Sequence, residues 1–271
     1  MKHGVNLPNM TDPRVLVDLA VTAEAAGWDG VFLWDHVVYA DVIDLPIVDP
    51  WVTLGAMAQA TSRVRLGPMV TPIARRRPWR VAQEITTLDH LSGGRAVLGV
   101  GLGWPAKEDF ANFGDRSHDV LRAEMLDEGL DLISALWSGE HVRHDGEHFD
   151  VDATMKPPPL QQPRVPIWVA GMWPNKRPFE RAAKWDGVFA MSAATDEVPL
   201  LRPDEVREVV AYITARRETG APFDVVVSGH WDHSPAEYEE AGVTWLIQSW
   251  NAEPGWEREL RPLIDQGPQT G

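Results

Sequence analysis

The feature that most constrains this fold is an alternation of short apolar segments with helical segments along almost the whole chain. Helix signals separate the apolar segments, such as Asp12 before Pro13 at one helix start. Buried strands that alternate with helices predict a parallel sheet covered by helices on its outer face. The segments with the length and apolar character of buried strands are residues 3–8, 29–34, 64–70, 95–101, 165–171, 186–191, 224–229 and 243–250.

Eight such strands in 271 residues predict one α/β domain over residues 1–271, a (β/α)8 TIM barrel. The interval from Trp104 to Val165 is too long for a single connecting helix, so we expect an insertion after the fourth strand. Within it, Asp145-Gly146 lies between alternating residues, which predicts a β-hairpin. A repeat, AAGWDGVF and AAKWDGVF, precedes the second and sixth strands. A looser third copy, EEAGVTWL, leads into the eighth strand. The repeat fits either two four-strand halves or one favourable turn used three times.

Charge and composition argue against several classes of function. The formal net charge is −15 and the chain has only one short basic run, 75–77, so a nucleic-acid partner is not expected. The absence of cysteine excludes disulfides, thiolate metal ligands and a cysteine nucleophile. The chain has no apolar run long enough to span a membrane, and its start lacks the features of a signal peptide. We therefore expect a cytoplasmic protein without a membrane partner.

Functional side chains gather after the predicted strands, at the carboxyl end of the sheet, where a TIM barrel has its active site. Asp35-His36 follows the second strand, and this pair is either catalytic or a helix cap next to a core histidine. Glycines after the fourth strand would let the backbone approach a ligand closely. Free amides at the helix start after the fifth strand, with Lys176 and Arg177, would form an anion site.

Tryptophans also fall near these strand ends. Together they would line a cavity for a flat aromatic ligand, although some of the 13 tryptophans must fill the core or subunit contacts. The tryptophans near this face are Trp34, Trp104, Trp173, Trp231 and Trp250.

Two histidine-rich stretches and the basic run each allow more than one interpretation. The histidines of 141–151 suggest a metal site, but the hairpin explains the same pattern. The stretch 230–233, HWDH, could hold a metal, bind the substrate or reach a cofactor. The run Arg75-Arg76-Arg77 is either a solvated helix start or a contact for a long anionic cofactor tail.

Several stretches resemble the bacterial luciferase-like flavin-dependent oxidoreductases and monooxygenases. The order and spacing agree from residue 1 to about residue 190, and LSGGR…LGVGLGW is specific to that family. The matching stretches are WDH (34–36), TLDHLSGGRAVLGVGLGW (87–104), EDFANFG (108–114), PPPLQQPRVPIWVAG (157–171) and FERAAKWDGVFA (179–190).

The resemblance implies a barrel that binds FMN or the deazaflavin coenzyme F-420 at its carboxyl face, with the phosphate near 171–177. It implies that His36 is an acid–base or substrate-facing residue, and we expect Asp35 to orient its ring. Many relatives carry a second glycine and a serine in the strand-five loop, where this chain has Gly-Met-Trp-Pro at 171–174. The expected cofactor-binding residues are Asn6, Thr71, Gly101, Gly103, Trp104, Ala170, Gly171, Met172, Lys176 and Arg177; the expected substrate-binding residues are Trp34, Trp231 and Trp250.

These observations predict a flavin-dependent oxidoreductase without a metal. The first hypothesis is a monooxygenase that uses O2 and reduced FMN, supplied by a separate flavin reductase, on a small organic substrate. The alternatives are hydride transfer with coenzyme F-420, a non-catalytic flavin-binding protein, and a metal-dependent hydrolase at the histidines. The apolar and tryptophan content and the resemblance also lead us to expect a homodimer.

Overall fold

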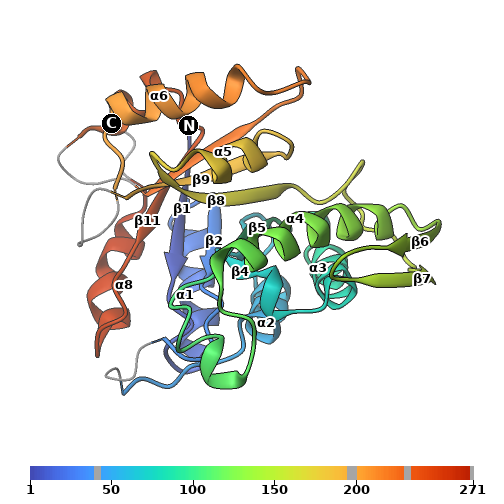
Figure 1. The fold of residues 1–271 in the computed structure, drawn as a ribbon. Helices are drawn as coiled ribbons and strands as arrows, with labels where there is room; N and C mark the ends of the chain where they lie inside the picture. The colour runs from blue at the N-terminus through green and yellow to red at the C-terminus, as the bar shows by residue number, and fades with distance from the viewer. Residues whose placement is uncertain (40–43, 194–199, 229–232, 269–271) are drawn as a thin grey trace.

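The apolar segments form the parallel strands of one sheet, as the sequence predicts (Figure 1). The structure is a computed structural model that describes residues 1–39, 44–193, 200–228 and 233–268. The sheet order is β3-β2-β1-β11-β10-β9-β8-β5-β4. Its strands are β1 (Lys2–Leu7), β2 (Gly30–Leu33), β3 (Arg65–Pro68), β4 (Thr71–Pro72), β5 (Leu98–Gly101), β8 (Ile167–Trp173), β9 (Gly187–Ser192), β10 (Asp224–Ser228) and β11 (Trp245–Ser249).

The sheet closes into a barrel where β3 meets the segment that leads into β5. The Leu66 amide donates to the Arg95 carbonyl at 3.2 Å, and the Val97 amide donates to the Leu66 carbonyl at 2.9 Å. The third predicted strand, 64–70, contains β3, and β4 follows directly after it, so the eight expected strand positions are confirmed. The close approach requires glycine, because a Cβ on Gly67 would lie 1.9 Å from the Val97 carbonyl oxygen.

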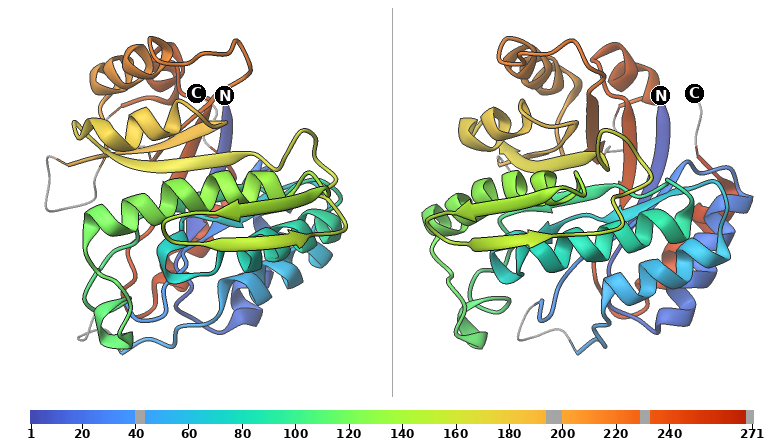
Figure 2. Two further views of the ribbon diagram at one scale, coloured as in Figure 1. Left: turned by 45° about the vertical axis from the view of Figure 1, so that its right-hand side comes forward. Right: turned by 90° about the vertical axis from the view of Figure 1, so that its right-hand side faces the viewer.

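Helices follow the strands and cover the outside of the barrel (Figure 2). Asp12 caps the first helix as the sequence predicts, accepting the Arg14 amide at 2.8 Å, and a proline opens the first turn. The apolar faces of the helices pack on the outward side chains of the strands to form the larger core cluster. The helices are α1 (Pro13–Ala25), α2 (Pro50–Ala60), α3 (Pro78–Ser92), α4 (Asp119–Leu136), α5 (Lys176–Ala182), α6 (Pro203–Thr214), α7 (Pro235–Glu240) and α8 (Trp256–Gln266).

The inside of the barrel is filled by a second core cluster built around aromatic rings. The ring centroids of Phe32 and Trp168 lie 5.4 Å apart, and those of Trp168 and Trp245 lie 5.3 Å apart. Glycines on the strands provide the space, because a Cβ on Gly30 would lie 2.8 Å from the Phe32 ring and a Cβ on Gly187 would lie 2.5 Å from the Trp168 ring. These rings close the barrel below its carboxyl end and form the floor of the site above.

The expected insertion after the fourth barrel strand is present. It contains the 3-10 helix η2 (Ala111–Phe113) and the antiparallel hairpin β6 (His141–Asp145) and β7 (Asp150–Thr154), which lies beside α4 in Figure 2. Glu128 of α4 contacts Nε2 of His144 at 3.0 Å and accepts the amide of Phe149 at 2.9 Å. In the described ranges, the His, Cys, Asp and Glu side chains form no group of three or more that could hold a metal ion. The described helices are also too short or too polar to cross a membrane.

We predict that Gly67→Ala destabilises the barrel, because the new methyl group collides with backbone at the point of closure. The expected loss in the free energy of unfolding is about 3 kcal/mol. The matched control is Gly55→Ala in α2, where the nearest atom to a new Cβ is 3.9 Å away. This control should stabilise the protein by about 0.5–1 kcal/mol, since alanine is the better helix former. Urea unfolding followed by circular dichroism measures both effects, and equal stability of the two variants would contradict the packing argument.

Candidate active site

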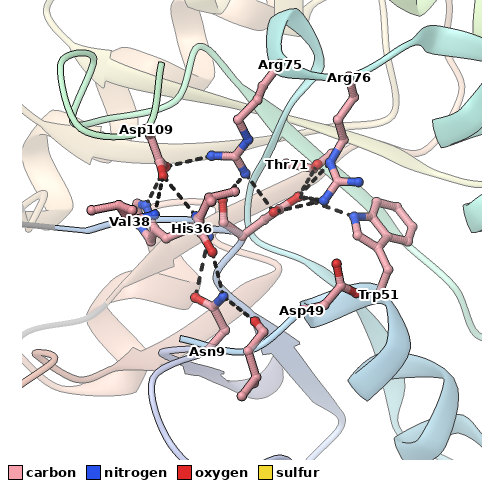
Figure 3. A network of polar contacts seen from close by, with 12 residues as sticks. Asn9, His36, Val38, Asp49, Trp51, Thr71, Arg75, Arg76 and Asp109 are labelled. Carbon is pink, nitrogen blue, oxygen red and sulfur yellow. Dashed lines mark hydrogen bonds and ion pairs between the residues drawn. The ribbon is translucent and has the colours of Figure 1, made fainter. Parts of the chain in front are cut away.

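Three loops at the carboxyl end of the barrel bring their charged side chains together (Figure 3). Strand β2 ends at Leu33, and the chain continues directly into Trp34, Asp35 and His36. The loop after β4 supplies two arginines, and the loop after β5 supplies Asp109. The result is a buried ionic network beside the barrel mouth.

Asp35 is the centre of this network, with a side chain that is 1% exposed. Its carboxylate accepts hydrogen bonds from the Thr71 hydroxyl, from Nη2 of Arg75 at 2.8 Å and from Nε1 of Trp51 at 3.3 Å. Nη2 of Arg76 lies 3.0 Å from its second oxygen. The carboxylate therefore holds two arginines in place, and it does not orient the ring of His36 as the sequence analysis expected.

Asp109 orients His36 instead. Its Oδ2 lies 2.8 Å from Nδ1 of His36, and its Oδ1 accepts the amides of Val37 and Val38, each at 2.9 Å. Nη1 of Arg75 also lies 2.7 Å from Oδ2, as an ion pair without hydrogen-bond alignment. Burial alone would raise the pKa of Asp109, but the contact with His36 and the charge of Arg75 lower it on balance. Asp109 is thus an ionised acceptor, so in the neutral form of the His36 ring the proton lies on Nδ1 and Nε2 has the lone pair.

Asn9, in the loop after β1, fixes the segment that follows His36. Its Nδ2 donates to the His36 carbonyl at 2.9 Å and to the Val48 carbonyl at 2.7 Å. The Val48 amide donates back to the Asn9 carbonyl at 2.9 Å. One buried amide side chain therefore fastens both the start and the end of the loop between β2 and α2.

Arg122 of α4 anchors the loop that carries Asp109. Its Nη1 donates to the carbonyls of Leu102 and Gly103, at 2.8 Å and 2.7 Å. Its guanidinium lies 4.7 Å from the ring centroid of Phe110, which is fully buried. Because Phe110 directly follows Asp109, this packing positions the carboxylate toward His36.

Aromatic rings also lie next to His36. The His36 ring centroid lies 5.6 Å from that of Trp34 and 4.9 Å from that of Tyr39. Trp104 continues the group, with its ring centroid 5.9 Å from that of Tyr39, and 67% of its surface is exposed. We call Trp34, Tyr39 and Trp104 the aromatic rim.

The side chains near the carboxyl end of the strands include an apolar group and a polar residue. Val70, Ala170 and Met191 pack against the ring cluster inside the barrel. Asn6 lies at the end of β1, with its Oδ1 buried and without a hydrogen-bond partner in the described residues. A flat ring with a polar N–H edge would cover the apolar side and satisfy this oxygen. The residues present therefore fit the ring system of a flavin or a deazaflavin.

Several expected cofactor residues have structural roles that the sequence analysis did not foresee. Thr71 is fully buried beneath Asp35. Gly101 packs closely on Val70, and Gly103 has a φ of +83° and packs on Phe110. A Cβ on Gly171 would lie 2.7 Å from Cβ of Pro178, so this glycine lets α5 approach β8. The structure gives these residues reasons to be present that do not involve a ligand.

The two cations after β8 differ in their surroundings. Nζ of Lys176 lies 3.3 Å from the ring centroid of Trp173 and 4.6 Å from that of Tyr212, between β8 and α6. Arg177 is exposed and has no hydrogen bond or ion pair with any described residue. Met172 on β8 is also exposed. Of the two predicted cations, Arg177 is the one available to an anion.

The expected cluster of tryptophans forms only in part. Trp34 lies close to His36, and Trp104 lies close to Tyr39, which is itself next to His36. Trp173 points outward, packs on Phe179 and donates to Glu208 at 3.3 Å, and Trp250 packs on the core between the sheet and the helices. Strand alternation explains this result, since neighbouring residues face opposite sides. Trp231, with His230, lies outside the described residues.

The basic run is not the solvated helix start that one interpretation of the sequence proposed. The side chains of Arg75 and Arg76 are 7% and 19% exposed and are held in the ionic network. Arg77 alone remains at the start of α3, over the ring of Trp79. Sequence reasoning also missed the roles of Asn9, Asp109 and Arg122, although EDF at 108–110 lay within a stretch that had been singled out.

Comparison with known proteins gives a family model that is described as luciferase-like monooxygenase and that matches residues 1–266. Among curated relatives, an F420-dependent glucose-6-phosphate dehydrogenase of Microbacterium testaceum is 37% identical over 166 residues, which are 60% of this chain and 48% of that protein. The chain thus spans about half the length of the curated relatives it matches first.

Solved structures of similar fold include enzymes with different chemistry. An F420-dependent secondary alcohol dehydrogenase, in complex with an F420-acetone adduct, aligns over 99% of both chains with a TM-score of 0.76 and 18% identity. The long-chain alkane monooxygenase LadA aligns over 98% of this chain and 90% of its own, with a TM-score of 0.75 and 18% identity. At these identities the likeness establishes the TIM-barrel fold alone.

We predict that Asp35→Asn destabilises the protein by about 3–5 kcal/mol, because it leaves Arg75 and Arg76 without their shared buried counter-charge. The matched control is Asp12→Asn, whose partner Arg14 is 90% exposed, so its midpoint should stay almost unchanged. Thermal unfolding of the two variants provides the measurement. A wild-type melting temperature for Asp35→Asn would mean that the network is not a stabilising element.

Proposed function

This chain belongs to the luciferase-like monooxygenase family, and from that premise we propose that it transfers a hydride between coenzyme F-420 and an organic alcohol or ketone. The coarser conclusion, an oxidoreductase of the luciferase-like type, follows from the family itself. The choice of F-420 is our proposal, and it reverses the order of preference in the sequence analysis, where FMN stood first.

The activities after which the more similar relatives are named support F-420 over FMN. Proteins named F420-dependent glucose-6-phosphate dehydrogenase match this chain at 37–39% identity in Microbacterium testaceum and Kineococcus radiotolerans. These matches cover 60% of this chain. The FMN and monooxygenase hypotheses draw on solved structures of far lower identity, such as the alkane monooxygenase at 18%. The cofactor preference therefore rests on the more similar relatives.

The observation that carries the proposed chemistry is the contact between His36 and Asp109. Oxidation of an alcohol to a ketone removes a hydride from carbon and a proton from the hydroxyl oxygen. F-420, when bound, supplies the hydride acceptor. In the neutral His36 ring the contact of Nδ1 with Asp109 at 2.8 Å places the proton on Nδ1, so Nε2 accepts the hydroxyl proton, and the carboxylate stabilises the imidazolium that forms. In the reverse direction His36 returns that proton to the ketone oxygen.

The residues that would hold the cofactor lie at the barrel mouth. We assign the ring to the surface of Val70, Ala170 and Met191, with Asn6 at its polar edge. We assign the phosphate to the loop after β8, where Arg177 is the available cation. The arginines at 75 and 76 are already paired with carboxylates, which argues against their use for an anionic tail.

A monooxygenase that uses reduced FMN from a separate reductase is the second candidate. It is favoured by the aromatic rim, because such chemistry needs a site that excludes water. A cofactor titration distinguishes the two candidates. The protein is titrated with F-420 and with FMN, each in its oxidised and reduced form, and tryptophan fluorescence reports binding. Tight binding of F-420 alone supports our proposal, and tight binding of reduced FMN alone overturns it. Binding of F-420 without turnover of any alcohol would favour a non-catalytic role.

We predict that His36→Ala keeps the affinity for F-420 within about threefold and lowers kcat by about 10²–10⁴, the usual contribution of a general acid or base. Asp109→Asn should lower kcat by about 10²-fold with little change in KM, because the amide no longer fixes the tautomer of His36. Steady-state kinetics of both variants, with melting temperatures as controls, gives the measurement. Wild-type turnover by His36→Ala would show that the histidine is structural.

We predict that Arg177→Ala weakens F-420 binding by about ten- to a hundredfold, the loss of a charge-assisted hydrogen bond to phosphate. The control is Arg207→Ala, an exposed arginine on α6. Gly171→Val is not a suitable second probe, because its side chain would collide with Pro178 and Phe179 and displace α5. Equal affinity of the two arginine variants, measured by fluorescence titration, would place the phosphate elsewhere.

A further inference from the structure

We infer that the substrate is an uncharged alcohol or ketone with an apolar or aromatic body, and not a sugar phosphate or another anion. The inference rests on the proposed hydride transfer and names the class of compound that its active site would take. It separates this chain from the glucose-6-phosphate dehydrogenases among its relatives. Two independent features of the mouth carry it, the distribution of positive charge and the aromatic rim.

The arginines beside His36 provide no free charge for an anion. Arg75 lies between two buried carboxylates, with Nη2 at 2.8 Å from Asp35 and Nη1 at 2.7 Å from Asp109. Arg76 shares Asp35 at 3.0 Å and contacts Glu84 at 3.4 Å. Two cations thus face three carboxyl groups. A phosphate brought to this network would have to displace a carboxylate that is already hydrogen-bonded and buried.

On one half of the barrel mouth, the described loop residues include no lysine or arginine. The sheet order places β10, β11, β1 and β2 side by side. The described residues of the loops that follow these strands include five aspartates and glutamates, and they are 233–234, 250–255, 8–12, 34–39 and 44–49. His36 belongs to the loop after β2, so the loops on its own side of the mouth add negative charge and no basic side chain in the described residues.

The basic residues of the other described loops and of the start of α5 contact neighbouring side chains, except Arg177 and Arg116. Nζ of Lys107 lies 3.7 Å from Glu108, Arg77 lies over the Trp79 ring, and Arg202 faces Asp204 and Glu205. Arg177 is assigned to the cofactor phosphate. Arg116 is exposed in the loop after β5, and its contribution is tested separately below.

The aromatic rim offers a binding surface of the opposite character. Trp104 is 67% exposed. Its ring centroid lies 5.9 Å from that of Tyr39, and the ring centroid of Tyr39 lies 4.9 Å from that of His36. Burial raises the pKa of Tyr39, so its phenol stays neutral beside the histidine. A flat apolar compound that covers Trp104 would gain burial on one side and place its hydroxyl toward His36. The aromatic rim carries no positive charge that could bind a phosphate.

The test compares two ligands that differ only in charge. The F-420 holoenzyme is titrated by calorimetry with 1-phenylethanol and with its carboxylate analogue, 4-(1-hydroxyethyl)benzoate, and with glucose 6-phosphate. We expect 1-phenylethanol to bind at least about tenfold more tightly than either anion. Trp104→Ala should lower the affinity for 1-phenylethanol by about tenfold. The matched control is Leu91→Ala at the far end of α3, another exposed apolar side chain, which should bind as the wild type does.

Charge at the rim provides a second arm of the test. Trp104→Arg should lower the affinity for 1-phenylethanol and raise the affinity for the carboxylate analogue, whereas Arg116→Ala should change neither affinity. The inference is overturned if either anion binds as tightly as 1-phenylethanol, or if 1-phenylethanol does not bind. A failure of the proposed function can be told apart from a failure of this inference, because a protein that does not bind F-420 shows this before any substrate is added. If FMN binds instead, the same titrations of the FMN-loaded protein still decide the substrate class.

Discussion

The architecture of the mouth depends on one buried carboxylate. Asp35 follows β2 without a turn, and water does not reach its side chain. A buried charge is costly unless it is paired and hydrogen-bonded, and here a hydroxyl, an indole and two guanidinium groups meet that requirement. Because these partners come from β4, from the segment after it and from the start of α2, satisfying the charge fixes these segments relative to each other. The geometry around His36 follows from this electrostatic requirement.

His36 gains its orientation at the far side of the same network. Arg75 contacts both Asp35 and Asp109, so it links the carboxylate that organises the loops to the one that holds the histidine. Asn9 and Arg122 secure the two chain segments that meet there. The ring of His36 is thus held by groups from the loops after β1, β2, β4 and β5. Such support suits a proton-transfer residue, since an error of about 1 Å in its position would cost much of its effect.

The sequence was sufficient to predict the barrel and the position of the site, but not the contacts within the site. Strands and helix starts are encoded locally, by apolar runs and by caps such as Asp12, so they can be recognised from a few neighbouring residues. The partner of His36 lies 73 positions away, and an aspartate at 35 was the nearer candidate. Only the folded chain reveals that Asp35 is already engaged by arginines. Likewise, Gly171 and Trp173 belong to the packing of α5 rather than to a ligand, because the side of β8 that each faces was not known.

Inside the barrel, rings from some strands fill the space that glycines on other strands leave, and this limits which substitutions the protein can accept. Gly30 on β2 leaves room for Trp245 on β11, and Gly187 on β9 leaves room for Trp168 on β8, so the volume inside the barrel is shared between strands. A methyl group added to one strand must be offset by atoms removed from another. Substitutions at these positions are therefore coupled, and each is tolerated only in the company of its counterpart. Single substitutions that accumulate during evolution are therefore expected in the loops above the barrel rather than in its interior.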